Sequence, residues 1–139
     1  MTTTRKQNLP IGIQTFARLR EEGCYYVDKT GQMLDLIASG STYFLSRPRR
    51  FGKSLLVDTL KELFEGNRAL FTGLEADTRW DWTVRHPVIR LSFGGGVLRD
   101  RVELDQRIAE LLDVYTGPLG LKVQHQSMGG RLETLIRHL

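Results

Sequence analysis

Residues 44–56 read Phe-Leu-Ser-Arg-Pro-Arg-Arg-Phe-Gly-Lys-Ser-Leu-Leu, and they place Gly52-Lys53-Ser54 between two different apolar patterns. Residues 42–45 are mostly β-branched or aromatic, which favours a strand. The apolar residues after the loop recur at helical spacing, at Leu56, Leu60, Leu63 and Phe64. A helix N-terminus offers unpaired N–H groups and a partial positive charge to a phosphate. The order strand, loop and helix therefore predicts a phosphate-binding loop from Ser46 to Ser54.

The residues at the end of this loop have distinct predicted roles. Gly52 lets the backbone approach the phosphates closely, Lys53 can reach the β and γ phosphates of a nucleotide, and the Ser54 hydroxyl can bind Mg²⁺. Ser54 is therefore the predicted metal ligand. The predicted cofactor-binding residues are Arg49, Arg50, Phe51, Gly52, Lys53, Ser54 and Leu55.

The start of the loop departs from the usual pattern. That pattern has a glycine five positions before Gly52, where this chain has Arg47. Pro48 biases Arg47 toward extended backbone and has no N–H of its own to donate. We therefore expect the loop to be entered differently, with Arg49 and Arg50 offsetting the donor lost at Pro48.

Two other interpretations of the same stretch stay open. The simpler one is a strand-to-helix turn whose basic residues are exposed for solubility. The other is a nucleic-acid contact patch made by Arg47, Arg49, Arg50 and Lys53, because cations this close together can neutralise backbone phosphates. Base-contacting aromatic residues do not recur at regular spacing, so nucleic-acid binding ranks behind nucleotide binding.

Composition bounds the class of protein. The chain has 139 residues, of which 40% are hydrophobic and 26% charged, as in an ordinary globular domain. The net charge of +4 is modest and is weak evidence for a nucleic-acid partner. Cys24 is the single cysteine, which excludes an internal disulfide and favours a reducing compartment. No apolar segment approaches the roughly 20 residues that span a bilayer. We predict a cytoplasmic protein without membrane contact, and nothing in the sequence indicates its oligomeric state.

Periodicity predicts alternating strands and helices. Strands are expected at residues 24–27, 42–45 and 87–93. Helices are expected at residues 14–22, 29–39 (with Asp28 as N-cap), from the end of the loop onward, at 100–115 and at 131–139. Trp80 and Trp82 are expected to anchor a long connection to the core. This order favours an α/β fold, a three-layer sandwich with a largely parallel sheet. We expect a disordered tail at residues 1–8 and a single domain at 9–139.

Nucleotide hydrolysis by such a loop needs a further acid, an Asp at the end of an apolar strand that holds Mg²⁺ and orients water. The expected strand at 87–93 ends in Ser92-Phe93-Gly94 without a carboxylate. Asp58 lies on the helix after the loop and is expected to face away from the phosphates. The remaining acidic residues lack this context, so no catalytic residue is assigned.

Five motifs together resemble the predicted AAA-type ATPase-like family found in bacteria. They are the loop Ser46–Ser54, Leu9-Pro10-Ile11-Gly12, Tyr25-Tyr26-Val27-Asp28-Lys29-Thr30, Leu70-Phe71-Thr72-Gly73-Leu74 and His86-Pro87-Val88-Ile89. The resemblance is strong over residues 8–98 and weak over the rest. It implies a P-loop domain that binds ATP with Mg²⁺, and the arginine-rich loop without the first glycine is similar to the family's own form.

The resemblance also implies that other members extend beyond this region. Those proteins continue into an apolar strand with an Asp-Glu pair, and often into a restriction-nuclease-like domain. Here the sequence stops at Leu139, which implies an N-terminal part that ends before the acidic Walker B strand, with a P-loop fold incomplete at its C-terminus. Nucleotide binding is then expected, hydrolysis by this chain alone is doubtful, and nucleic acid would be contacted through a nuclease-like region absent here.

Overall fold

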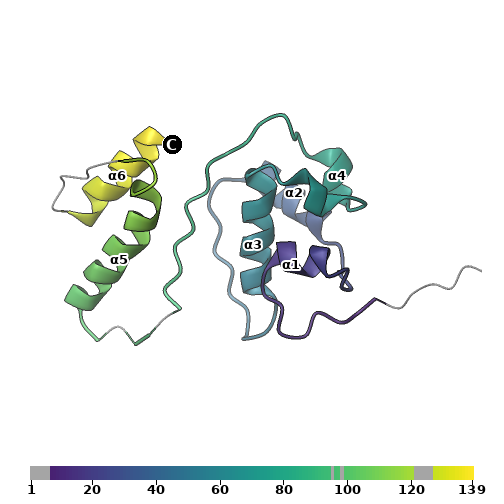
Figure 1. The fold of residues 1–139 in the computed structure, drawn as a ribbon, viewed down its shortest axis with the longest axis horizontal. Helices are drawn as coiled ribbons and strands as arrows, with labels where there is room; N and C mark the ends of the chain where they lie inside the picture. The colour runs from purple at the N-terminus through teal and green to yellow at the C-terminus, as the bar shows by residue number, and fades with distance from the viewer. Residues whose placement is uncertain (1–6, 95, 98, 121–126) are drawn as a thin grey trace, which may run out of the picture. The chain divides into compact units, whose positions relative to one another are not determined.

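The computed structural model describes residues 7–94, 96–97, 99–120 and 127–139, which form helices joined by extended segments (Figure 1). The helices are α1 (Phe16–Glu21), α2 (Thr30–Ser39), α3 (Lys53–Phe64), the 3₁₀ helix η1 (Arg68–Phe71), α4 (Glu75–Arg79), α5 (Arg101–Thr116) and α6 (Met128–His138). The chain divides into two compact units, Met1–Val88 and Ile89–Leu139, called here the N-terminal and C-terminal units. The predicted tail lies mostly outside the described residues, and the single domain at 9–139 stays a prediction.

The predicted α/β sandwich with a largely parallel sheet is wrong, because the described residues are helical and form no sheet. The segments predicted as strands, residues 24–27, 42–45 and 87–93, do not pair with one another. A single parallel bridge is recorded among the described residues: it joins Asn8 to Cys24, with the Tyr25 N–H donating to the Asn8 carbonyl at 2.8 Å. β-branched and aromatic residues suit a pleated surface, but a strand also needs a neighbour for its backbone N–H and C=O groups. At residues 42–45 and 87–93 the strand-type residues occur without such a neighbour.

The predicted helices are confirmed as α1, α2, α3, α5 and α6, with small shifts at their ends. The largest shift is in α6, which begins at Met128 rather than at residue 131 because Ser127 caps it, its hydroxyl accepting from the Gly130 N–H at 3.2 Å. The sequence pattern did not reveal α4 and η1. Both are short and lie in a stretch whose polar, turn-rich composition hides their few buried residues.

The core of the N-terminal unit is built from residues on all its helices. Phe16, Leu34, Leu63, Phe71 and Ala76 form the buried cluster. The Phe16 and Phe71 rings lie 4.8 Å apart between centroids, and Trp82 lies 5.2 Å from Phe71. Trp80 packs against the same cluster. The prediction that both tryptophans anchor the long connection to the core is therefore confirmed.

Asp28 joins the starts of two helices. One oxygen of its carboxylate accepts from the Thr30 N–H at 2.8 Å and from the Thr30 hydroxyl at 2.7 Å, and the other accepts from the Glu75 N–H at 2.7 Å. The Thr30 hydroxyl oxygen in turn accepts from the Ala76 N–H at 3.0 Å. The predicted capping role is confirmed, although Lys29 rather than Asp28 holds the N-cap position of α2. The Asp28-Lys29-Thr30 motif thus fixes α2 to α4.

The C-terminal unit is a pair of packed helices with an extended segment held against one of them. Leu112 of α5 and Leu135 of α6 are buried. Asp100 caps α5 by accepting from the Glu103 N–H at 2.8 Å. The Tyr115 hydroxyl accepts from the Arg90 N–H at 2.7 Å and donates to the Arg90 carbonyl at 2.9 Å. This side chain therefore makes the backbone contacts at Arg90 that a neighbouring strand would otherwise make.

Candidate phosphate-binding site

The predicted loop is an exposed connection between α2 and α3. Every residue from Ser41 to Gly52 is exposed, and the trace between the two helices in Figure 1 is extended and carries no arrow. Its beginning is held by Tyr43, whose hydroxyl donates to the Leu36 carbonyl of α2 at 2.5 Å and lies 3.2 Å from the Ser39 hydroxyl. The segment is thus attached to α2 at one end and continues directly into α3 at the other.

Two residues in the left-handed backbone region shape the end of the loop. Arg50 has φ 67° and Gly52 has φ 75°. Gly52 is the N-cap of α3, and its conformation is one that glycine adopts without steric cost. Arg50 has no such freedom, and a non-glycine residue held there costs on the order of 1–3 kcal/mol. The chain therefore maintains a tight turn before α3 at an energetic cost.

Lys53 closes this turn with its side chain. As the first residue of α3, it directs its ammonium group back to the carbonyls of Arg47 and Pro48, at 2.5 and 2.7 Å. These are the residues where the loop departs from the usual glycine pattern. The Lys53 ammonium therefore lies within the predicted phosphate-binding loop, where it is held by two backbone carbonyls.

The start of α3 leaves backbone donors ahead of the helical hydrogen bonds. The Leu56 N–H donates to the Gly52 carbonyl at 2.9 Å, so the N–H groups of Lys53, Ser54 and Leu55 precede that ladder. No side chain caps α3 and no acidic residue lies in its first turn. By contrast, α5 and α6 carry their own capping oxygens, from Asp100 and Ser127. The α3 terminus is thus open to an external acceptor.

The other predicted site residues divide between exposed and structural positions. Arg49, Arg50 and Phe51 are exposed, as is Ser54, whose hydroxyl could bind a metal ion. The Leu55 side chain packs against the core cluster, so only its N–H remains for a ligand. The structure thus gathers the predicted residues in one turn, as their adjacency in sequence requires.

Asp58 takes no part in this turn. Its carboxylate is only 5% exposed and accepts from the Phe16 N–H, the first residue of α1, at 2.7 Å. A negative charge at a helix N-terminus is favourable, so Asp58 stabilises α1 against α3. It faces away from the loop, as helical geometry predicts.

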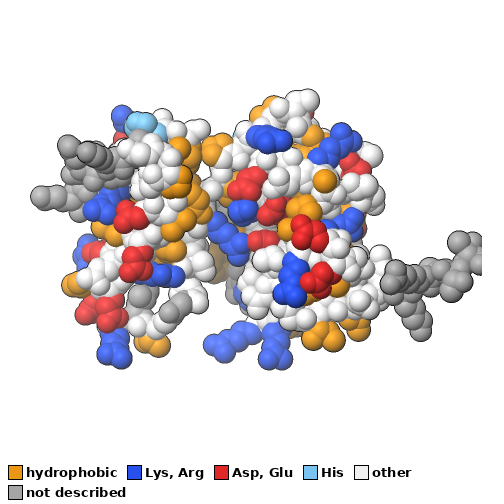
Figure 2. All heavy atoms as spheres, viewed as in Figure 1, with side chains coloured by type: hydrophobic (Ala, Val, Ile, Leu, Met, Phe, Trp, Pro, Cys, Tyr) orange, Lys and Arg blue, Asp and Glu red, His pale blue; other side chains and the backbone are white. Residues whose placement is uncertain are grey.

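The charged residues in and around the loop are all basic. From Leu36 to Val57 the chain has no acidic residue, whereas Arg47, Arg49, Arg50 and Lys53 are all basic. Figure 2 shows Lys and Arg side chains projecting at the lower edge of the N-terminal unit, below the start of α3 in the view of Figure 1. An anion approaching this turn would meet a positive field together with backbone donors.

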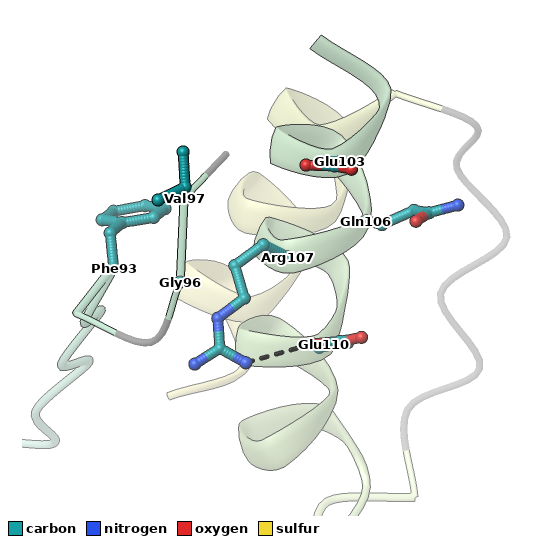
Figure 3. Close-up of a pocket in the computed structure, with 7 residues that line it drawn as sticks. All are labelled: Phe93, Gly96, Val97, Glu103, Gln106, Arg107 and Glu110. Atoms are coloured by element: carbon teal, nitrogen blue, oxygen red, sulfur yellow. Dashed lines mark hydrogen bonds and ion pairs between the residues drawn. The ribbon is translucent and has the colours of Figure 1, made fainter. Parts of the chain in front are cut away.

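Two hollows of the surface lie away from this loop. One, of about 270 Å³, lies in the C-terminal unit, where Phe93 and Val97 lie on the Arg107 side of α5 (Figure 3). Arg107 donates to Glu110 at 3.1 Å there, so its charge is balanced within the hollow. Another, of about 530 Å³, lies in the N-terminal unit beside α1 and η1 and includes Glu62 and Arg68. Neither is lined by residues 46–54, and the candidate site is an exposed turn because Ser46 to Gly52 are exposed.

Neither a metal cluster nor a membrane-spanning helix is found among the described residues. No group of three or more of their His, Cys, Asp or Glu side chains could hold a metal ion. None of their helices is long and apolar enough to cross a membrane.

Phe44 is an exposed residue that the sequence pattern did not single out. It is 93% exposed, beside a Tyr43 that is bonded to α2. The alternation of side chains along an extended segment was the available signal, because it places neighbours on opposite faces. The β-branched and aromatic residues at 42–45 predicted a strand instead.

Comparison with known proteins gives a family match. The family model described as "Predicted AAA-ATPase" matches residues 10–139. A curated relative from Azotobacter chroococcum mcd 1, named "Uncharacterized protein in vnfD 5'region", is 57% identical over 133 residues, which are 95% of this chain and 26% of the relative. The chain thus spans about a quarter of the length of that relative. No solved structure matches the chain.

Proposed function

The chain belongs to the predicted AAA-ATPase family, and we propose that it binds the triphosphate of ATP, together with Mg²⁺, at the loop from Ser46 to Ser54. The observation that carries this proposal is the turn before α3. Arg50 and Gly52 are held in left-handed conformations there, and the N–H groups after them precede the first helical hydrogen bond. Strained backbone of this kind is retained where it serves a purpose, and successive N–H groups at a helix start suit a phosphate.

The residues present fit the phosphate groups. The N–H groups of Lys53, Ser54 and Leu55 supply donors, and α3 adds the partial positive charge of its N-terminus. A Cβ built on Gly52 meets nothing within 4 Å, so the space beside the backbone is open to a ligand. Pro48 has no N–H to donate to a phosphate. Arg49 and Arg50, both exposed, can offset this missing donor with positively charged side chains. The loop thus binds phosphate mainly through backbone donors and neighbouring cations.

Lys53 must change partners when the nucleotide binds. Its ammonium is held by the carbonyls of Arg47 and Pro48, and a phosphate oxygen offers it a charged acceptor instead. A phosphate oxygen adds the attraction of opposite charges, which the neutral carbonyls do not offer, and this favours the exchange. The Arg47 and Pro48 carbonyls, which no longer accept from Lys53, then accept hydrogen bonds from water.

Mg²⁺ bound with the nucleotide would be held by the Ser54 hydroxyl, the phosphates and water, which suits an ion that keeps several waters. The ion would neutralise charge on the phosphates. The proposal covers binding alone. Asp58, the carboxylate nearest in sequence after the loop, is occupied by the Phe16 N–H, and turnover is not assigned to this chain.

Titration with Mg-ATP tests the proposal, with Lys53→Ala compared against Lys61→Ala. Lys61 lies on the same helix and is paired with Glu65 at 2.8 Å, so it is a matched lysine outside the loop. Loss of one charged hydrogen bond, about 1.5–3 kcal/mol, should weaken ATP binding by Lys53→Ala at least about tenfold. Lys61→Ala should bind as the unchanged protein does. Equal affinity of all three proteins for Mg-ATP would contradict nucleotide binding at this loop.

A further inference from the structure

An exposed aromatic residue accompanies the arginines of the loop. Phe44 is 93% exposed and Phe51 is 64% exposed, and Arg47, Arg49 and Arg50 lie between them in sequence. We propose that this segment, residues 44–51, binds single-stranded nucleic acid, with the Phe44 ring stacking on a base and the arginines binding the backbone phosphates. The proposal goes beyond nucleotide binding, because Phe44 lies outside the phosphate-binding loop.

The exposure of Phe44 follows from how the segment is anchored. Tyr43 turns toward α2, where its hydroxyl donates to the Leu36 carbonyl. Neighbouring side chains of an extended backbone point to opposite sides, so Phe44 is directed away from α2. The bond that fixes Tyr43 therefore also presents the Phe44 ring to solvent.

Stacking and charge together favour one class of partner. Proteins that bind single strands without sequence preference usually stack the nucleobases on aromatic side chains and bind the backbone with nearby Lys and Arg residues. The segment provides both elements, and the chain has no acidic residue from Leu36 to Val57 to repel phosphates. A duplex keeps its base faces stacked inside, so it can use the arginines but not Phe44. Single strands are therefore the partner that this arrangement fits.

The backbone that carries the arginines is fixed before any partner binds. The turn that holds Arg49 and Arg50 is closed by Lys53 on the Arg47 and Pro48 carbonyls. Since those carbonyls are held by the ammonium, the arginine side chains project from a backbone already fixed in place. A preorganised surface loses less conformational freedom on binding.

Fluorescence anisotropy of a labelled unstructured oligonucleotide, in DNA and in RNA form, tests the proposal with the full chain. Phe44→Ala should weaken binding roughly 5- to 150-fold, the range for one stacked base. Phe44→Leu, which keeps apolar bulk but lacks a π face, should be as weak, and Phe44→Trp should bind as tightly as the unchanged protein. Phe93→Ala, which removes a 45% exposed phenylalanine of the C-terminal unit, is the matched control and should have no effect.

Salt dependence tests the arginines separately. Arg47→Ala should reduce the slope of log affinity against log salt by about 0.7, the value for one phosphate contact on a single strand. Arg18→Ala, which removes an exposed arginine of α1, should leave that slope unchanged. Duplex DNA should bind more weakly than the single strand and be insensitive to Phe44→Ala.

The outcomes separate this proposal from nucleotide binding. Phe44→Ala should retain its affinity for Mg-ATP. A failure of oligonucleotide binding can therefore be told apart from a failure of ATP binding. An oligonucleotide that binds wild type and Phe44→Ala equally would overturn the stacking role. Binding to anionic phosphatidylserine vesicles without binding to either oligonucleotide would overturn the proposal and identify the segment as a membrane contact.

Discussion

At the scale of single residues, backbone conformation separates glycines that have equal room for a side chain. A Cβ on Gly52 or on Gly129 would meet nothing within 4 Å. Gly52 has φ 75° at the N-cap of α3, whereas Gly129 lies within α6. Any difference between alanine substitutions at these positions therefore reflects backbone preference and not crowding.

We expect Gly52→Ala to destabilise the N-terminal unit by about 1–2 kcal/mol, the cost of a left-handed L-residue. Gly129→Ala should stabilise the C-terminal unit by about 0.5–1 kcal/mol, because glycine is a poor helix former. Urea unfolding measures both. The two tryptophans, Trp80 and Trp82, report on the N-terminal unit, and far-ultraviolet circular dichroism reports on helix content. A neutral Gly52→Ala would mean that this turn is not left-handed in solution.

At the scale of elements, one hydroxyl, that of Thr30, contributes directly to the contact between α2 and α4. Thr30 is fully buried, donates to Asp28 and accepts from the Ala76 N–H. Gly31, the next residue, lies against the Glu75 side chain at the start of α4. Thr30 and Gly31 both lie at the contact between α2 and α4. Polar contacts as well as apolar packing therefore set the position of α4.

Thr30→Val keeps the shape of the side chain and removes the hydroxyl, which leaves the Ala76 N–H without that acceptor. We expect a loss of about 1–3 kcal/mol in the free energy of unfolding. Thr30→Ser keeps the hydroxyl and loses one methyl group, at about 0.8 kcal/mol. Urea denaturation followed by tryptophan fluorescence compares the two. Thr30→Val at least as stable as Thr30→Ser would show that the hydrogen bond to α4 contributes little.

Helices could be predicted from the sequence because their evidence is local. Periodic apolar residues such as Leu60 and Leu63 of α3, and caps such as Asp100, specify a helix within a few turns. The segments at 42–45 and 87–93 have strand-type residues, but pairing depends on a distant neighbour that no local pattern reveals. Tyr43 and Tyr115 instead bond to the carbonyls of Leu36 and Arg90, contacts that residue type alone does not predict.

At the scale of the whole molecule, the candidate site could be located but not fully described from sequence. Its residues are contiguous, so Gly52, Lys53 and Ser54 come together whatever the fold. The return of Lys53 to the Arg47 and Pro48 carbonyls and the exposure of Phe44 depend on three-dimensional structure. Among the described residues no sheet covers the turn, and Ser46 to Gly52 are exposed.

Acid sensitivity is a property of the N-terminal unit as a whole, since Asp28, Asp77 and Asp81 all lie in it. Desolvation acts to raise the pKa of Asp28, but the hydrogen bonds from Thr30 and from the Glu75 N–H outweigh it, and the net pKa is lowered. The bond from Arg68 lowers the pKa of Asp77, and the bond from the Thr83 hydroxyl lowers that of Asp81. Each folded pKa is below its unfolded value of about 3.9.

A carboxylate with a lowered folded pKa contributes stability that is fully present above its unfolded pKa and is lost as pH falls through the folded pKa. We therefore expect the free energy of unfolding to be level near neutral pH and to fall below about pH 4. Asp28→Asn should be less stable at neutral pH and fall less steeply in acid, because that group no longer titrates. Gln32→Ala, at an exposed position of the same helix, should keep the wild-type slope. Urea unfolding across this pH range measures the free energy of unfolding as a function of pH. If Asp28→Asn and the unchanged protein have the same slope of this free energy against pH, Asp28 does not contribute to the acid sensitivity of the N-terminal unit.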